Sequence, residues 1–136
     1  MQKTINTVCV VDDDLIYQFT TKKIIESTKL VEKIITFSDG EKAIEFFYAL
    51  SENAVDTPDI VLLDINMPIM DGWDFLKEYV MIKPKLSKKI TIYLVSSSVH
   101  DTDVERAKQM SDVTDYVIKP VTRDKFIEMF RDFLNV

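Results

Sequence analysis

Val61-Leu62-Leu63-Asp64-Ile65-Asn66-Met67-Pro68, followed closely by Asp71-Gly72, is the stretch that decides the fold. The uninterrupted apolar run at 60–63 predicts a strand buried on both faces, as in a parallel sheet that helices cover. The strand should end at Asp64, because Pro68 and Gly72 indicate a turn soon afterwards. Open α/β sheets bind their ligands at the carboxyl ends of their strands, so Asp64 is the first candidate for chemistry.

Three other apolar runs also end in polar side chains. Residues 8–11 are followed by Asp12-Asp13-Asp14, residues 92–95 by Ser96, and residues 116–118 by Lys119. The carboxyl ends of parallel strands share one edge of the sheet. We therefore expect carboxylates, a hydroxyl and an ammonium to gather around Asp64.

Strands and helices alternate along the whole chain. Strands are predicted at 7–11, 33–37, 59–63, 89–95 and 115–118. Helices are predicted at 15–27, after Gly40, after Gly72, at 102–110 and at 123–134, with a polar loop at 51–58. Right-handed crossovers between such elements give an α/β fold, a doubly wound (βα)5 parallel sheet with helices on both faces. The flavodoxin-like strand order 2-1-3-4-5 places the functional crevice between the first and third strands, which end in Asp12-Asp13 and Asp64.

The predicted helices differ in the quality of their apolar faces. The last helix has the clearest stripe, formed by Phe126, Met129, Phe130, Phe133 and Leu134. The first has a helical but imperfect spacing of Ile16, Phe19 and Ile24. The fourth has a poor face, formed by Val104, Ala107 and Met110. We therefore expect the fourth helix to be the least well anchored.

The composition limits the class of protein. The 136 residues, 46% of them hydrophobic, suit one compact domain with one core. A net charge of -6 and the lack of basic tracts disfavour nucleic-acid binding. The single cysteine, Cys9, lies in an apolar run, so no internal disulfide can form and a buried thiol is expected. Neither a signal peptide nor an apolar run of the ~20 residues that span a bilayer occurs, so we expect a cytoplasmic protein without membrane association.

The polar side chains at the strand ends indicate a chemistry. Clustered carboxylates repel one another, and a divalent cation would relieve this. A few carboxylate ligands suit Mg²⁺, and the one histidine, His100, is assigned to a surface loop. Mg²⁺ beside Asp64, with Lys119 and Ser96 facing it, suits phosphoryl transfer in which Asp64 attacks and becomes an aspartyl phosphate. Each of these residues alone has an ordinary explanation; Asp13, for example, could equally well cap a helix. The prediction of phosphoryl transfer therefore depends on their combination.

Four motifs resemble those of the receiver domain of two-component response regulators, the family of the chemotaxis regulator. They are Val10-Val11-Asp12-Asp13, Leu63-Asp64-Ile65-Asn66-Met67-Pro68-Ile69-Met70-Asp71-Gly72, Val95-Ser96-Ser97 and Tyr116-Val117-Ile118-Lys119-Pro120. The resemblance covers essentially the whole chain. It implies a single receiver domain at 1–136, with no output domain.

The resemblance also implies a role for each site residue. Asp64 would accept a phosphoryl group from a phosphohistidine on a sensor histidine kinase or histidine phosphotransfer protein. Asp13, Asp64 and the backbone carbonyl of Asn66 would bind Mg²⁺, with Asp12 holding a metal-bound water. The implied switch consists of the Ser96 hydroxyl, the Lys119 ammonium and the Tyr116 ring, and the Lys119–Pro120 peptide bond would be cis.

By the same resemblance the chain would be a signalling phosphoacceptor, with at most slow autodephosphorylation, and not an enzyme. Phosphorylation would change the surface made by the fourth helix, fifth strand and fifth helix. That surface would bind an unknown downstream protein or a second copy of the chain, or the phosphoryl group would be relayed onward.

Two other functions stay open at the level of sequence. A receiver-like binding module that is never phosphorylated would carry the same fold. A Mg²⁺-dependent phosphatase acting through an aspartyl phosphate would resemble haloacid dehalogenases. Such an enzyme would require a second acidic residue two positions after the nucleophile. Asn66 stands at that position here, which disfavours the phosphatase.

Overall fold

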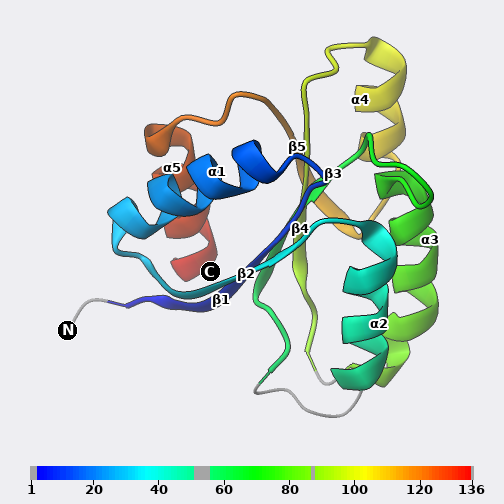
Figure 1. The fold of residues 1–136 in the computed structure, drawn as a ribbon, viewed down its shortest axis with the longest axis horizontal. Coiled ribbons are helices and arrows are strands. Elements are labelled where there is room, and N and C mark those ends of the chain that lie inside the picture. Colours follow the sequence, from blue (N-terminus) through cyan, green and yellow to red (C-terminus); the bar gives the residue numbers. More distant parts are fainter. Residues whose placement is uncertain (1–2, 51–55, 87, 136) are drawn as a thin grey trace.

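A parallel sheet forms the centre of the computed structural model, which describes residues 3–50, 56–86 and 88–135 (Figure 1). Its strands are β1 (Ile5–Val11), β2 (Val31–Phe37), β3 (Ile60–Asp64), β4 (Thr91–Ser96) and β5 (Val113–Ile118). They lie in the order β2-β1-β3-β4-β5, and each neighbouring pair is parallel. The predicted flavodoxin-like topology is therefore confirmed.

Helices cover both faces of the sheet. They are α1 (Leu15–Thr28), α2 (Gly40–Leu50), α3 (Gly72–Ile82), α4 (Asp101–Lys108) and α5 (Arg123–Leu134), and a short 3₁₀ turn, η1 (Lys83–Lys85), follows α3. Figure 1 shows α1 and α5 on one side, and α2, α3 and α4 on the other. Most of the predicted loop at 51–58 lies outside the described residues. No helix in the described part of the chain has the length and apolar character needed to cross a membrane.

Strand β3 is buried on both faces, as its sequence predicts. Val61 and Leu63 pack into the apolar core under α2 and α3, whereas Ile60 and Leu62 pack into the core under α1 and α5. This alternation follows from the period of two along a strand. Each fully buried aliphatic side chain contributes roughly 1.5–3 kcal/mol. Asp64, which ends this strand, is therefore held by a rigid element.

The helix α1 exists as predicted, but of the three apolar residues behind the prediction only Ile24 packs against the core. Ile16 and Phe19 are 80% and 65% exposed. The buried residues are instead Gln18, Thr21, Ile25 and Thr28. The Gln18 amide donates to the carbonyl oxygens of Asp12 and Phe37, at 2.5 and 3.0 Å. These hydrogen bonds join the start of α1 to the ends of β1 and β2 and turn the helix so that Ile16 faces solvent.

The expectation for α4 is confirmed. Among the eight described residues of this helix, Ala107 alone is buried. Arg106 packs over the Trp73 ring of α3, with its guanidinium carbon 4.3 Å from the ring centroid. Cys9 is fully buried in β1, also as expected, and burial raises the pKa of its thiol.

Candidate functional site

Asp64 lies where the end of β3 meets the start of α3. The Gly72 N–H donates to the Ile65 carbonyl at 2.8 Å, and Asp71 caps the helix by accepting from the Asp74 N–H. A Cβ atom added to Gly72 would lie 2.7 Å from the Asp64 carbonyl oxygen and 2.9 Å from the Ile65 Cα. Both neighbours are backbone atoms that cannot rotate away. Glycine is therefore required for α3 to begin this close to Asp64.

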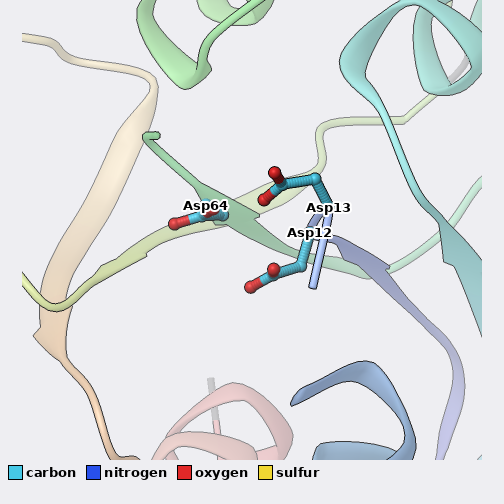
Figure 2. Close-up of side chains that lie close together, drawn as sticks. All are labelled: Asp12, Asp13 and Asp64. Atoms are coloured by element: carbon cyan, nitrogen blue, oxygen red, sulfur yellow. The ribbon is translucent and has the colours of Figure 1, made fainter. Parts of the chain in front are cut away.

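Asp64 forms an acidic cluster with two other aspartates. The carboxylates of Asp12, Asp13 and Asp64 each offer an oxygen, and these atoms all lie within 4.8 Å of one another. Figure 2 shows the three side chains close together at the ends of β1 and β3. Asp14 caps α1 by accepting from the Tyr17 N–H at 3.0 Å, so Asp13 is not the helix cap. Capping of α1 therefore leaves the carboxylates of Asp12, Asp13 and Asp64 available to the acidic cluster.

Lys119 supplies a positive charge to this cluster. Its Nζ lies 2.8 Å from Asp12 Oδ2 and 3.4 Å from Asp64 Oδ1. The backbone positions it, because the Lys119 N–H donates to the Ser96 carbonyl at 2.9 Å. The Lys119–Pro120 peptide bond is cis. The ammonium thus contacts two of the three carboxylates, and its single positive charge leaves the site with an excess of negative charge.

Burial and the excess negative charge together raise the pKa of Asp64. Burial, followed by the charge of Asp12, raises this pKa from 3.8 to about 6, although Lys119 partly offsets the rise. Burial lowers the pKa of Lys119, but its hydrogen bond to Asp12 and the two carboxylate charges outweigh burial and raise it. A cation would relieve the repulsion. Hard carboxylate oxygens without histidine or thiolate in the cluster are the donor set of Mg²⁺, so the residues present fit this ion.

Ser96 and Tyr116 are both hydrogen-bonded to Ser98, in the segment that leads to α4. Ser96 is fully buried, and its Oγ accepts from the Ser98 N–H at 3.0 Å. The Tyr116 hydroxyl donates to the Ser98 carbonyl at 2.8 Å. Ser98 Oγ in turn donates to Asp103 in the first turn of α4, also at 2.8 Å. A displacement of Ser96 would therefore change the position of Ser98 and, through its hydrogen bond to Asp103, the position of α4.

The predicted Asn66 lies exposed two residues after Asp64. Ile69, further along the same loop, is 84% exposed and has a φ of 68°. This left-handed backbone is unfavourable for a β-branched residue. The loop beside the acidic cluster thus contains a strained position that presents an apolar side chain to solvent.

Sequence reasoning missed one side chain that touches the site. The Tyr17 ring lies under the Lys119 ammonium, with Nζ 4.1 Å from the ring centroid. Helical spacing could have placed Tyr17 one turn after Asp13. The contact with Lys119 had no sequence signal, because it joins segments far apart in the chain.

Comparisons with known proteins agree with this geometry. The family model of the response regulator receiver domain matches residues 8–131. A two-component response regulator of Cytophaga hutchinsonii has a solved structure with a TM-score of 0.89 and 31% identity, covering 98% of this chain and 100% of that one. A receiver protein of Dyadobacter fermentans has a TM-score of 0.81 and 26% identity, covering 95% and 98% of the two chains.

A curated relative in Geobacter sulfurreducens is named protein-glutamate methylesterase/protein-glutamine glutaminase 3. It is 34% identical over 113 residues, which are 83% of this chain and 27% of the relative. The chain thus spans about a quarter of the length of that relative.

Proposed function

Because the chain belongs to the response regulator receiver domain family, we propose that it is a signalling phosphoacceptor that takes a phosphoryl group onto Asp64. The observation that carries the proposal is the position of the Asp64 carboxylate. It is 6% exposed at the end of β3, beside two further carboxylates and 3.4 Å from the Lys119 ammonium. These groups match the needs of phosphoryl transfer, namely an oxygen nucleophile and positive charge around the transferred oxygens.

In the reaction, an Asp64 carboxylate oxygen attacks the phosphorus of a phosphohistidine. The new P–O bond forms as the P–N bond breaks, and the electron pair of the broken bond stays on the imidazole nitrogen, which takes up a proton. Lys119 donates to a phosphoryl oxygen, and Ser96 donates to another. Asp13, Asp64 and the backbone carbonyl of Asn66 would hold Mg²⁺, with Asp12 acting through a water, and the bound ion would neutralise the remaining charge.

The donor is a protein, either a sensor histidine kinase or a histidine phosphotransfer protein. Support comes from exposed apolar side chains next to the acidic cluster. Leu15 and Ile16 follow Asp13-Asp14 directly, and Ile69 follows Asp64 in the next loop, and all three are at least 66% exposed. Apolar side chains gathered around a functional site are typical of a surface that binds another protein.

The output is a change of the surface made by α4, β5 and α5. A phosphoryl group on Asp64 adds negative charge and acceptor oxygens, which draw Ser96 and Lys119 toward it. Ser96 then releases the Ser98 N–H. This weakens the hydrogen bond that the Tyr116 hydroxyl donates to the Ser98 carbonyl and the one that the Ser98 hydroxyl donates to Asp103. A groove of about 260 Å³ between α4 and β5 lies on this surface. The population shift there signals to a downstream protein, favours pairing with a second copy, or accompanies relay of the phosphoryl group.

The test is the intact mass of the protein after incubation with acetyl phosphate, with and without Mg²⁺. We expect one added phosphoryl group that requires both Mg²⁺ and Asp64, and none on Asp64→Asn. Glu45→Gln, which changes an exposed carboxylate on α2, is the matched control and should be phosphorylated normally. Without any adduct or phosphate release, the chain is a phosphorylation-independent binding module. Rapid multiple-turnover release of phosphate would instead make it a phosphatase.

A further inference from the structure

The Lys119 ammonium is enclosed on three sides. Asp12 Oδ2 lies 2.8 Å away, Asp64 Oδ1 lies 3.4 Å away, and the Tyr17 ring centroid lies 4.1 Å away. The Lys119 side chain is 18% exposed. Two of these neighbours belong to the acidic cluster, whereas the aromatic ring comes from the first turn of α1.

Tyr17 is anchored at the start of α1. Its backbone N–H donates to the Asp14 carboxylate at 3.0 Å. Its side chain is partly buried and packs against the apolar core under α1 and α5. The ring thus forms one wall of the lysine site.

We propose that Tyr17 is a positioning residue for phosphoryl transfer, and that its ring holds the Lys119 ammonium where it meets the phosphoryl group on Asp64. This inference deepens the proposed function and rests on it. A lysine side chain has four flexible carbons and a strongly hydrated ammonium. A ring face against the ammonium limits where it can go and removes water from one side of it. Both effects strengthen the pull of Lys119 on the charge of the transferred group.

A different explanation would assign Tyr17 to the binding of the donor protein, because Ile16 beside it is exposed. Acetyl phosphate separates the two, since this small donor needs no protein surface. A ring that acts through Lys119 affects transfer from acetyl phosphate, whereas a docking residue affects transfer from a protein donor alone. The kinetic experiment therefore uses acetyl phosphate.

The variants are Tyr17→Leu, which removes the ring, and Tyr17→Phe, which keeps it. We expect Tyr17→Leu to lower the rate of phosphorylation by roughly 3- to 30-fold. Tyr17→Phe, which keeps the ring, should retain most of the wild-type phosphorylation rate. Phe19→Leu is the matched control, because Phe19 lies under Lys23 at 5.5 Å on the same helix but does not touch the acidic cluster. In a Lys119→Met background, Tyr17→Leu should have no further effect.

A second readout needs no phosphorylation. Protons above an aromatic ring resonate upfield, so the ε-methylene protons of Lys119 should be shifted upfield in the metal-free protein. The shift should remain in Tyr17→Phe and disappear in Tyr17→Leu. A wild-type rate in Tyr17→Leu, equal rates in the Phe and Leu variants, or an unshifted Lys119 would each overturn the inference. If the wild-type protein is not phosphorylated at all, the proposed function fails together with the kinetic role of Tyr17, while the ring shift still reports the contact with Lys119.

Discussion

Replacing Asp64 with asparagine should stabilise the metal-free protein at neutral pH. In the folded protein the pKa of Asp64 is raised from 3.8 to about 6, first by burial and then by the charge of Asp12. At about 1.4 kcal/mol for each pH unit, this rise corresponds to roughly 3 kcal/mol. Solvent at the open edge of the sheet weakens both the effect of burial and the repulsion from Asp12, so we expect Asp64→Asn to gain about 2 kcal/mol of unfolding free energy.

The gain should depend on pH in a defined direction. Between about pH 4 and pH 6 the folded protein keeps a proton on Asp64 that the unfolded chain has already released. The stability of the wild type therefore falls as the pH rises through this window, while the asparagine variant is spared this loss. The difference between the two proteins should widen by about 1–2 kcal/mol from pH 4.5 to pH 7.5 and then stay constant.

Urea denaturation in the presence of EDTA, repeated at several pH values, measures this difference. Glu45→Gln removes a carboxylate from the exposed face of α2 and should show no such widening. Addition of Mg²⁺ should reduce the gap, since a ligand that binds the folded wild type stabilises it by mass action. If Asp64→Asn is no more stable than wild type at pH 7.5 without metal, or if the stability difference does not change with pH, then burial and the charge of Asp12 do not disfavour the ionised Asp64 as the structure implies.

Three further substitutions test other features of the fold. Gly72→Ala should lower the unfolding free energy by about 2 kcal/mol in urea denaturation, because its Cβ would lie 2.7 Å from the Asp64 carbonyl oxygen. Ile69→Asn should raise the melting temperature and add about 1 kcal/mol, since asparagine tolerates the left-handed backbone at a φ of 68°. Arg106→Met should expose Trp73, shift its fluorescence to the red, and speed hydrogen exchange in α4 by about fivefold, which corresponds to a loss of about 1 kcal/mol.

Matched variants define the contradicting results. Val99→Asn changes another exposed apolar residue outside the left-handed backbone region, so a gain equal to that of Ile69→Asn would argue against relief of strain. Lys108→Met removes an exposed cation from α4, so an equal effect on exchange would make the contact with Trp73 irrelevant. If Gly72→Ala left the unfolding free energy unchanged, the start of α3 could move away from Asp64.

The sheet was predictable because its pattern is hydrophobic and local. Burial of Ile60, Val61, Leu62 and Leu63 in two cores follows directly from an apolar run with a period of two. Strand ends were less predictable, since hydrogen bonds from elsewhere set them. The strand β1 begins at Ile5, two residues before the predicted start at 7. The Ile5 N–H donates to the Leu30 carbonyl at 2.7 Å.

The orientation of α1 was not predictable from its apolar residues. Gln18 is buried because its amide bridges the carbonyl oxygens of Asp12 and Phe37, whereas Ile16 and Phe19 remain exposed. A polar residue that satisfies backbone groups of two strands thus outweighs the apolar spacing. Hydrophobic periodicity carries no information about such contacts.

The acidic cluster and Lys119 were predictable because strand ends share one edge of a parallel sheet. Asp12, Asp13 and Asp64 lie together for this reason. The contact of Tyr17 with Lys119 was not predictable, because it joins a side chain of α1 to one that follows β5, far apart in the chain. The same holds for the bond from Ser98 to α4, which depends on the path of the connecting segment.

The central claim, that Asp64 carries the phosphoryl group, is tested most directly by chemical trapping. The protein is incubated with acetyl phosphate and Mg²⁺, reduced with borohydride, and mapped by peptide mass spectrometry. Borohydride converts an aspartyl phosphate into the alcohol, homoserine, and leaves free carboxylates unchanged. We predict homoserine at position 64 and at no other aspartate. Homoserine at another position, or none in a protein whose intact mass shows a phosphoryl group, would contradict the account.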